Sequence, residues 1–203
     1  MSDWQVDFIK QGALPKLAWL TEVATDARVV TVHHGGAVET RPHWFVEGTW
    51  DGRFEAGDFH RAENLFGSGM RVDGSTLTFC ASVALVDRLF HVAWNDRLLV
   101  SNSLIQLLAR TGARLDPRHN YRKESFASGR GIKHYPRSFK VLHPEIREVF
   151  QDYHCNLVIA EGRIERQLRS QPKRWTLNEG SAALRIESAA SANNDAITQH
   201  IGS

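Results

Sequence analysis

The chain has 203 residues, of which 42% are hydrophobic and 24% charged, and its formal net charge at pH 7 is +2. This composition excludes a disordered chain and allows one globular domain with its own core, or one domain and a tail. No apolar run approaches the roughly 18 residues of a membrane-spanning helix, and the first ten residues lack the layout of a secretory signal. We therefore expect a cytoplasmic protein without a membrane partner.

The first half of the chain predicts strands separated by short helices. Residues 13–24 have the pattern of a short helix, and the apolar runs at 27–34 and 43–50 are typical of strands. Residues 57–69 predict a second short helix, which Gly67 and Gly69 would end. Residues 75–83 are rich in β-branched and aromatic side chains, which favours a strand.

Residues 86–104, VDRLFHVAWNDRLLVSNSL, predict a hairpin followed directly by a helix. Its two apolar runs are separated by Asn95-Asp96, which tolerate the positive φ of a tight turn. The three polar residues 101–103 can each accept a backbone N–H as a helix N-cap, and a leucine-rich stripe continues to Gly112.

The remaining chain continues this pattern. After Asp116-Pro117 a less regular segment leads to RSFKVL and EIREVFQ, and residues 156–169 predict two strands around a turn at Glu161-Gly162. Residues 176–179 form a capping box that predicts the start of a C-terminal helix. Because most predicted elements are strands, and strands that are consecutive in the sequence mostly form hairpins, the expected class is α+β with antiparallel sheets.

The residues most often used in catalysis and metal binding give little signal. Cys80 and Cys155 lie in apolar runs, which predicts buried thiols rather than disulfides or catalytic groups. Ten histidines are present, but His33-His34 point to opposite faces of a strand and lack the acidic companion of a zinc site. We expect no metal, and no Gly-x-Ser-x-Gly element of a serine hydrolase occurs.

Residues 75–117 resemble the closing part of the amino-terminal domain of the asparagine synthetase family. That family has an Arg-Asp or similar pair after a strand, then a hairpin turn, then a triplet that opens a leucine-rich helix. The matching places are taken here by Asp87, the Asn95-Asp96 turn and residues 101–103. GIKHYPRSFKVLHPE and the later NLVIAEGRIERQLRSQPKRW resemble its Gly-Ile stretch, its proline-containing strand and its closing hairpin. The resemblance covers roughly residues 74–175.

This resemblance implies a fold of two stacked antiparallel sheets flanked by helices, the Ntn-hydrolase-like sandwich. Residues 1–175 would form the glutaminase-like domain. Residues 176–203 would form a helical segment that begins a truncated second domain.

The sequence departs from the family where the chemistry lies. Active members begin with a cysteine whose free amine and thiolate attack glutamine. This chain begins Met1-Ser2-Asp3, so removal of Met1 would leave the Ser2 hydroxyl as the candidate nucleophile. An active N-terminal serine amidohydrolase is the weakest of the alternative functions. The Asn-Gly-Glu and Gly-Asp-Thr-Glu-like segments are absent, and each missing oxyanion donor costs about 10²–10³ in rate. We expect no catalytic residue in this chain.

Active members also continue into an ATP-pyrophosphatase domain with a Ser-Gly-Gly-x-Asp-Ser phosphate loop, which is absent here. The chain is therefore expected to hold no cofactor, with ATP and Mg²⁺ confined to a synthetase-like partner in cis or in trans. The resemblance implies an inactive glutamine-amidotransferase-like domain that supports this ATP-dependent amide-forming partner.

A basic stretch at residues 109–140 carries nine Lys or Arg against Asp116 and Glu124. Such a surplus attracts anions, with Tyr121, Phe126 and Tyr135 available for stacking. The basic stretch fits a solvated surface, a surface that binds an acidic partner, or a nucleic-acid or nucleotide-binding module. Such a module is the alternative function for this chain. We do not expect nucleic acid to be the partner. The candidate anion- or partner-binding residues are Arg118, Arg122, Lys123, Arg130, Lys133 and Arg137.

Overall fold

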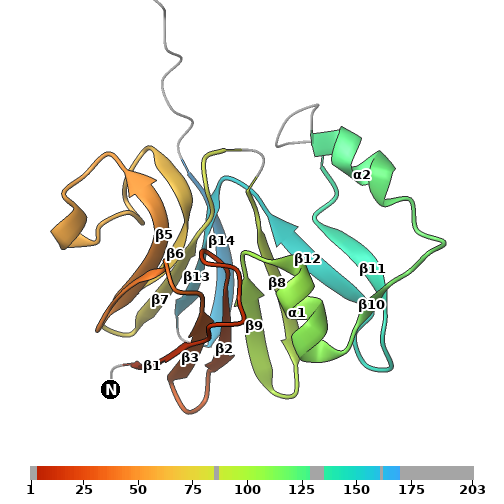
Figure 1. Ribbon diagram of the computed structural model, residues 1–203, viewed down its shortest axis with the longest axis horizontal. Helices are drawn as coiled ribbons and strands as arrows, with labels where there is room; N and C mark the ends of the chain where they lie inside the picture. Colours follow the sequence, from red (N-terminus) through yellow and green to blue (C-terminus); the bar gives the residue numbers. More distant parts are fainter. Residues whose placement is uncertain (1–3, 85–86, 129–134, 161, 170–203) are drawn as a thin grey trace, which may run out of the picture. The chain divides into compact units, whose positions relative to one another are not determined.

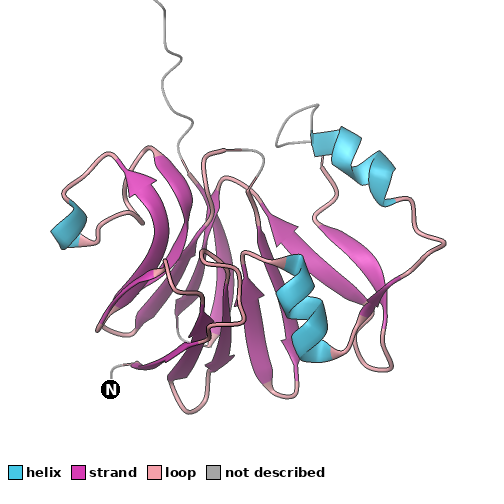
Figure 2. Cartoon of the chain, in the orientation of Figure 1, coloured by secondary structure: helices cyan, strands magenta, loops and turns pink. Residues whose placement is uncertain are grey.

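The computed structural model describes residues 4–84, 87–128, 135–160 and 162–169, all within one unit that spans Met1–Ser170. Its elements are mainly strands, and they form two sheets (Figures 1 and 2). The first sheet has the order β1 (Gln5–Lys10), β3 (Val29–His34), β2 (Trp19–Ala24), β9 (Arg97–Ser101), β8 (Leu89–Trp94), β12 (Glu148–Asp152), β11 (Ser138–Leu142), β10 (Arg114–Leu115). The second has the order β14 (Arg163–Leu168), β13 (Cys155–Ala160), β7 (Thr76–Cys80), β6 (Leu65–Asp73), β5 (Trp44–Trp50), β4 (Glu39–Arg41).

Neighbouring strands pair antiparallel, except that β1 pairs with β3 in parallel. The described helices are α1 (Leu104–Thr111) and α2 (Tyr121–Ser128), with a single 3-10 turn, η1, at Phe54–Ala56. The coarse expectation of a strand-rich protein with two sheets is therefore confirmed. The parallel pairing of β1 with β3 departs from the expected antiparallel sheets.

The two sheets share one hydrophobic core. Trp19 on β2 is fully buried, and its ring lies 4.9 Å from the ring of Phe45 on β5 and 6.2 Å from that of Phe79 on β7. On the opposite face of the first sheet, α1 inserts the fully buried Leu107 beside Leu20 of β2. The central strands of the first sheet are thus covered on both faces.

The helix predicted at residues 13–24 is wrong, because this segment contains strand β2. Trp19 and Val23 face the core between the sheets, whereas Leu20 packs beneath α1. A strand buried on both faces shows a continuous apolar run rather than an alternating one, and such a run has no period that separates it from a helix.

The helix predicted at residues 57–69 is also wrong. Its second half belongs to β6, which pairs with β5 so that Gly67 lies directly opposite Gly48. Both glycines have positive φ, 119° and 145°, and a Cβ at Gly67 would collide with the carbonyl oxygen of Glu47. Gly48 and Gly67 therefore allow a close backbone approach. Gly67 and Gly69 both lie within β6 and do not end a helix.

Other predicted elements are confirmed. Asn95 and Asp96 have φ of 51° and 55° and form the turn between β8 and β9. Ser103 is the N-cap of α1, since its hydroxyl accepts a hydrogen bond from the backbone N–H of Gln106, and Gly112 is the C-cap. The capping box at 176–179 and the domain boundary at residue 175 lie outside the described residues.

Candidate functional site

A pocket of about 440 Å³ lies where the two sheets meet, beside the N-terminal end of α1. The second sheet contributes Glu47 of β5. The first sheet and its connections contribute the remaining lining residues, which are Pro15, Leu17, Ala18, Asp87, Arg88, Phe90, Asn102 and Ser103. We call this the Glu47 pocket.

A chain of hydrogen bonds crosses from one sheet to the other behind this pocket. Trp19 on β2 donates from Nε1 to the hydroxyl of Ser68 on β6 over 3.0 Å, and that hydroxyl donates to Oε1 of Glu47 over 2.6 Å. Asn102 donates from Nδ2 to the same oxygen of Glu47 over 3.2 Å. Its Oδ1 also accepts from the backbone N–H of Trp19 over 2.9 Å. The Glu47 carboxyl is therefore held in one orientation by donors from both sheets.

The environment of Glu47 favours its neutral form. Burial raises the pKa of this carboxyl above its ordinary value, and the nearby Asp87 adds to the shift. The hydrogen bonds from Ser68 and Asn102 only partly oppose it. The side chains of Ser68 and Asn102 both donate to Oε1, and a backbone hydrogen bond from Ser68 to the carboxyl also lowers its pKa. Glu47 is thus a pocket-lining carboxyl with a raised pKa, which is a feature typical of functional sites.

The sequence interpretation missed Glu47 and the bridging role of Asn102. A signal for Glu47 was present, because residues 45 and 47 lie on the same face of a strand and Phe45 is a core residue. Asn102 was predicted only as one of three possible helix caps. Its side chain instead bonds to Glu47, to Trp19 and to the carbonyl of Leu17 over 3.0 Å.

The described candidates of the basic stretch lie at separate places. Arg118 is highly exposed and pairs with Asp116 over 3.1 Å. The exposed side chain of Arg122 lies 5.6 Å from the ring centre of Phe126 on α2, and the neighbouring Lys123 is also exposed. Arg130 and Lys133 lie outside the described residues. The assignment of this set to anion or partner binding stays a prediction.

Arg137 belongs to a different environment, a cluster around the buried Asp152. Its Nη2 lies 3.5 Å from Oδ1 of Asp152, whereas Nε of Arg166 lies 2.6 Å from that oxygen. His91 lies 3.0 Å from Oδ2. Burial would raise the pKa of Asp152, but the hydrogen bonds and charges of His91 and Arg166 outweigh it and lower that pKa.

Of the three aromatic residues predicted to be available for stacking, only Phe126 is largely exposed. Phe126 is 66% exposed, but Tyr135 is only 7% exposed and lies edge-on against Tyr153. Tyr121 donates its hydroxyl to the carbonyl of Lys140 and packs edge-on against Phe139. Tyr135 and Tyr121 are therefore wrong as free stacking surfaces, because their rings pack within the fold.

The two cysteines are free and buried, as the apolar context predicted. Burial raises the pKa of both thiols to about 12. Cys80 pairs in register with Asn156, so Cys155 points to the other face of the second sheet and cannot meet it.

Among the described residues, no cluster of three or more His, Cys, Asp or Glu side chains is arranged to hold a metal ion. The described helices also include none with the length and apolar character needed to cross a membrane.

Comparison of the chain with models of protein families, with curated proteins and with solved structures finds no match.

Proposed function

We propose that this chain is a catalytically inactive, glutamine amidotransferase-like domain of an asparagine-synthase-related protein, with an Ntn-hydrolase-like sandwich fold. It supports an ATP-dependent, amide-forming synthetase domain, located in the same polypeptide or in a separate one. In this proposal the synthetase partner holds the ATP and Mg²⁺.

The observation that carries the proposal is the composition of the Glu47 pocket. Glutamine hydrolysis by covalent catalysis needs a thiolate, or a hydroxyl activated by a neighbouring base. The described lining includes one hydroxyl, that of Ser103, which is engaged as the N-cap of α1. Both thiols lie elsewhere, and their raised pKa keeps them protonated at neutral pH. The described part of the pocket therefore offers a carboxyl held in place, which supports a binding or structural role.

The surface of α2 supports a protein partner. Arg122 and the exposed ring of Phe126 lie together, and the neighbouring Lys123 is also exposed. Arginine and aromatic residues are enriched in protein interfaces. The alternative function is a nucleic-acid or nucleotide-binding module that uses residues 109–140, and the same exposed cations would serve it.

Two measurements test the proposal. The purified chain should release no ammonia from glutamine above the buffer control. Release that is abolished by Ser2→Ala would overturn the assignment as inactive.

The second measurement is co-purification with the phosphate-loop synthetase encoded nearest to this chain. We expect a complex that is lost when Arg118, Arg122 and Lys123 are all changed to serine. It should survive the same change at Arg53, Arg147 and Arg163, three exposed arginines outside the stretch. Absence of a complex with the unmodified chain would contradict a supporting role toward a separate synthetase polypeptide.

A further inference from the structure

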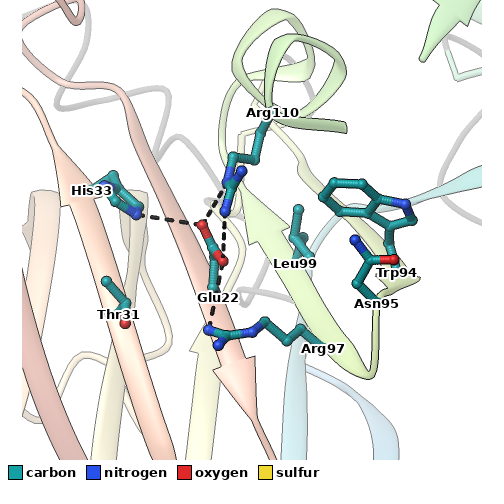
Figure 3. A pocket seen from close by; sticks show the side chains of 8 residues that line it. All are labelled: Glu22, Thr31, His33, Trp94, Asn95, Arg97, Leu99 and Arg110. Carbon is teal, nitrogen blue, oxygen red and sulfur yellow. Dashed lines mark hydrogen bonds and ion pairs between the residues drawn. The ribbon is translucent and has the colours of Figure 1, made fainter. Parts of the chain in front are cut away.

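A second pocket, of about 370 Å³, lies on the face of the first sheet that α1 covers (Figure 3). Its floor is a cross-strand row, because Glu22 on β2 pairs in register with Thr31 on β3 and with Leu99 on β9. The walls are His33 on β3, Trp94, Asn95 and Arg97 from the β8–β9 hairpin, and Arg110 from α1. We call this the Glu22 pocket.

Glu22 holds two guanidinium groups in place from opposite sides (Figure 3). Arg110 donates from Nε to Oε1 over 2.6 Å and from Nη2 to Oε2 over 3.1 Å, a two-point pair. Nη1 of Arg97 lies 3.6 Å from Oε2, and Nε2 of His33 lies 3.4 Å from Oε1. The side chain of Glu22 is only 7% exposed. Burial alone would raise its pKa, but the Arg110 hydrogen bond and charge outweigh this, so the carboxylate stays ionised at neutral pH.

The residues that line the pocket carry more positive charge than the Glu22 carboxylate neutralises, and more hydrogen-bond donors than it accepts from. One carboxylate against two guanidiniums leaves a net charge of +1, before any protonation of His33. In the described part of the chain, no group accepts a hydrogen bond from the Arg97 guanidinium, from Nη1 of Arg110 or from the Asn95 amide. The Thr31 hydroxyl likewise has no hydrogen-bond partner there. Arg110 alone would satisfy Glu22, so Arg97 supplies a second cation whose donors remain open to a ligand.

We propose that the Glu22 pocket binds a phosphate monoester, with Arg97 and Arg110 as the charged ligands and Glu22 as the positioning residue. A phosphate dianion is attracted by the excess positive charge, and its three terminal oxygens can accept from donors that come from several directions. A carboxylate has two oxygens in one plane and would leave some of these donors unpaired. The pocket is also larger than an inorganic phosphate requires, which leaves room for an organic group beside Trp94.

An adjacent pocket shows why the anion belongs on this side of the hairpin. That pocket shares Trp94, Asn95 and Arg97 with the Glu22 pocket, but Asp96 and Glu145 line it as well. Its carboxylates outnumber its one arginine, so it repels an anion. The positive field is therefore confined to the side where Arg110 and Arg97 flank Glu22. This site is separate from the Glu47 pocket, and the proposed function does not depend on it.

Titration calorimetry of the whole chain with phenyl phosphate tests the proposal, in about 50 mM salt so that screening is modest. The pH should be about 7.5, where the monoester is a dianion. We expect saturable binding of one equivalent, weaker binding of inorganic phosphate, and weaker binding still of benzoate. Arg97→Ala should lower the affinity about tenfold or more, since a charge-assisted hydrogen bond is removed. Arg163→Ala removes the same charge from an exposed position on β14 and should leave the affinity unchanged.

Thr31→Val provides a second variant that keeps the Arg97–Glu22 contact, and it should also weaken binding. Absence of saturation by phenyl phosphate up to about 10 mM would overturn the proposal. Equal affinity of Arg97→Ala and the unmodified chain for phenyl phosphate would overturn the assignment of binding to the Glu22 pocket. Benzoate binding as tightly as phenyl phosphate would overturn the assignment to phosphate.

Discussion

Arg166 on the edge strand β14 lies with its Nε 2.6 Å from Oδ1 of Asp152 on β12, and the Asp152 side chain has no exposed surface. This ion pair joins the edge of the second sheet to the first sheet. The hydroxyl of Tyr135 accepts a further hydrogen bond from Nη2 of Arg166 over 3.1 Å. The guanidinium thus has acceptors on two sides, and the carboxylate that it neutralises cannot reach water.

Arg166→Met should destabilise the fold by about 3 kcal/mol or more, because it leaves the buried Asp152 carboxylate without the closest of its cationic partners. Chemical denaturation followed by tryptophan fluorescence measures the loss. Arg163→Met, on the same strand but exposed and without an ion pair in the described region, is the control and should change stability by less than about 0.5 kcal/mol. Equal effects of the two variants would show that the Asp152 contact contributes nothing.

Glu47→Gln should stabilise the protein at neutral pH and have little effect near pH 4. The folded-state pKa of Glu47 is raised, mainly by burial, so folding favours the protonated carboxyl. The contribution of this group to stability is therefore fully present below its unfolded pKa and is lost as pH rises through the folded pKa. Glutamine mimics the neutral form and can still accept from Ser68 and Asn102. Free energies of unfolding at the two pH values check this, and a variant less stable than the parent at neutral pH would contradict it.

Leu107→Ala should cost about 2–5 kcal/mol, because this side chain is fully buried between α1 and the first sheet. Ile105→Ala on the same helix is the matched control. Ile105 is 81% exposed, so its truncation should change stability by no more than about 0.5 kcal/mol. Denaturation midpoints of both variants give the comparison. A loss well below 1 kcal/mol at Leu107 would mean that α1 is not docked on the sheet.

The triple change of Arg118, Arg122 and Lys123 to serine should leave nucleic-acid binding weak and non-specific, as in the unmodified chain. If the basic stretch served nucleic acid, each phosphate that is no longer neutralised would reduce the slope of log affinity against log salt by roughly 0.7–0.9. Fluorescence anisotropy with a labelled oligonucleotide over a salt series measures both quantities. Sub-micromolar binding by the unmodified chain at physiological salt, abolished in the triple variant, would favour the binding module instead.

The local elements that the sequence predicted correctly are those with a strong short-range cause. The Asn95-Asp96 turn follows from two residues that tolerate positive φ, and the start of α1 follows from a polar cap before a leucine stripe. The burial of both cysteines follows in the same way from the apolar runs around them.

The predictions that failed depended on neighbours distant in the chain. Strand β2 resembled a helix because its two buried faces are covered by different partners, the second sheet and α1. In the basic stretch at residues 109–140, whose role stays a prediction, two cations have acidic partners that the sequence did not show: Arg110 pairs with Glu22, and Arg137 lies near Asp152. Both acids lie outside that stretch.

The sequence by itself determined a strand-rich chain, a hairpin that leads into a capped helix, and two inert thiols, because each follows from interactions between residues close in the chain. Only the tertiary structure decided where Glu47 and Glu22 lie and what surrounds them. Glu47 meets Ser68 and Asn102, and Glu22 meets Arg97 and Arg110, through strand pairing and packing over separations of 21 to 88 residues. Burial and ion pairing act through space, so the pKa of these carboxyls, and the chemistry open to each pocket, depend on the folded arrangement.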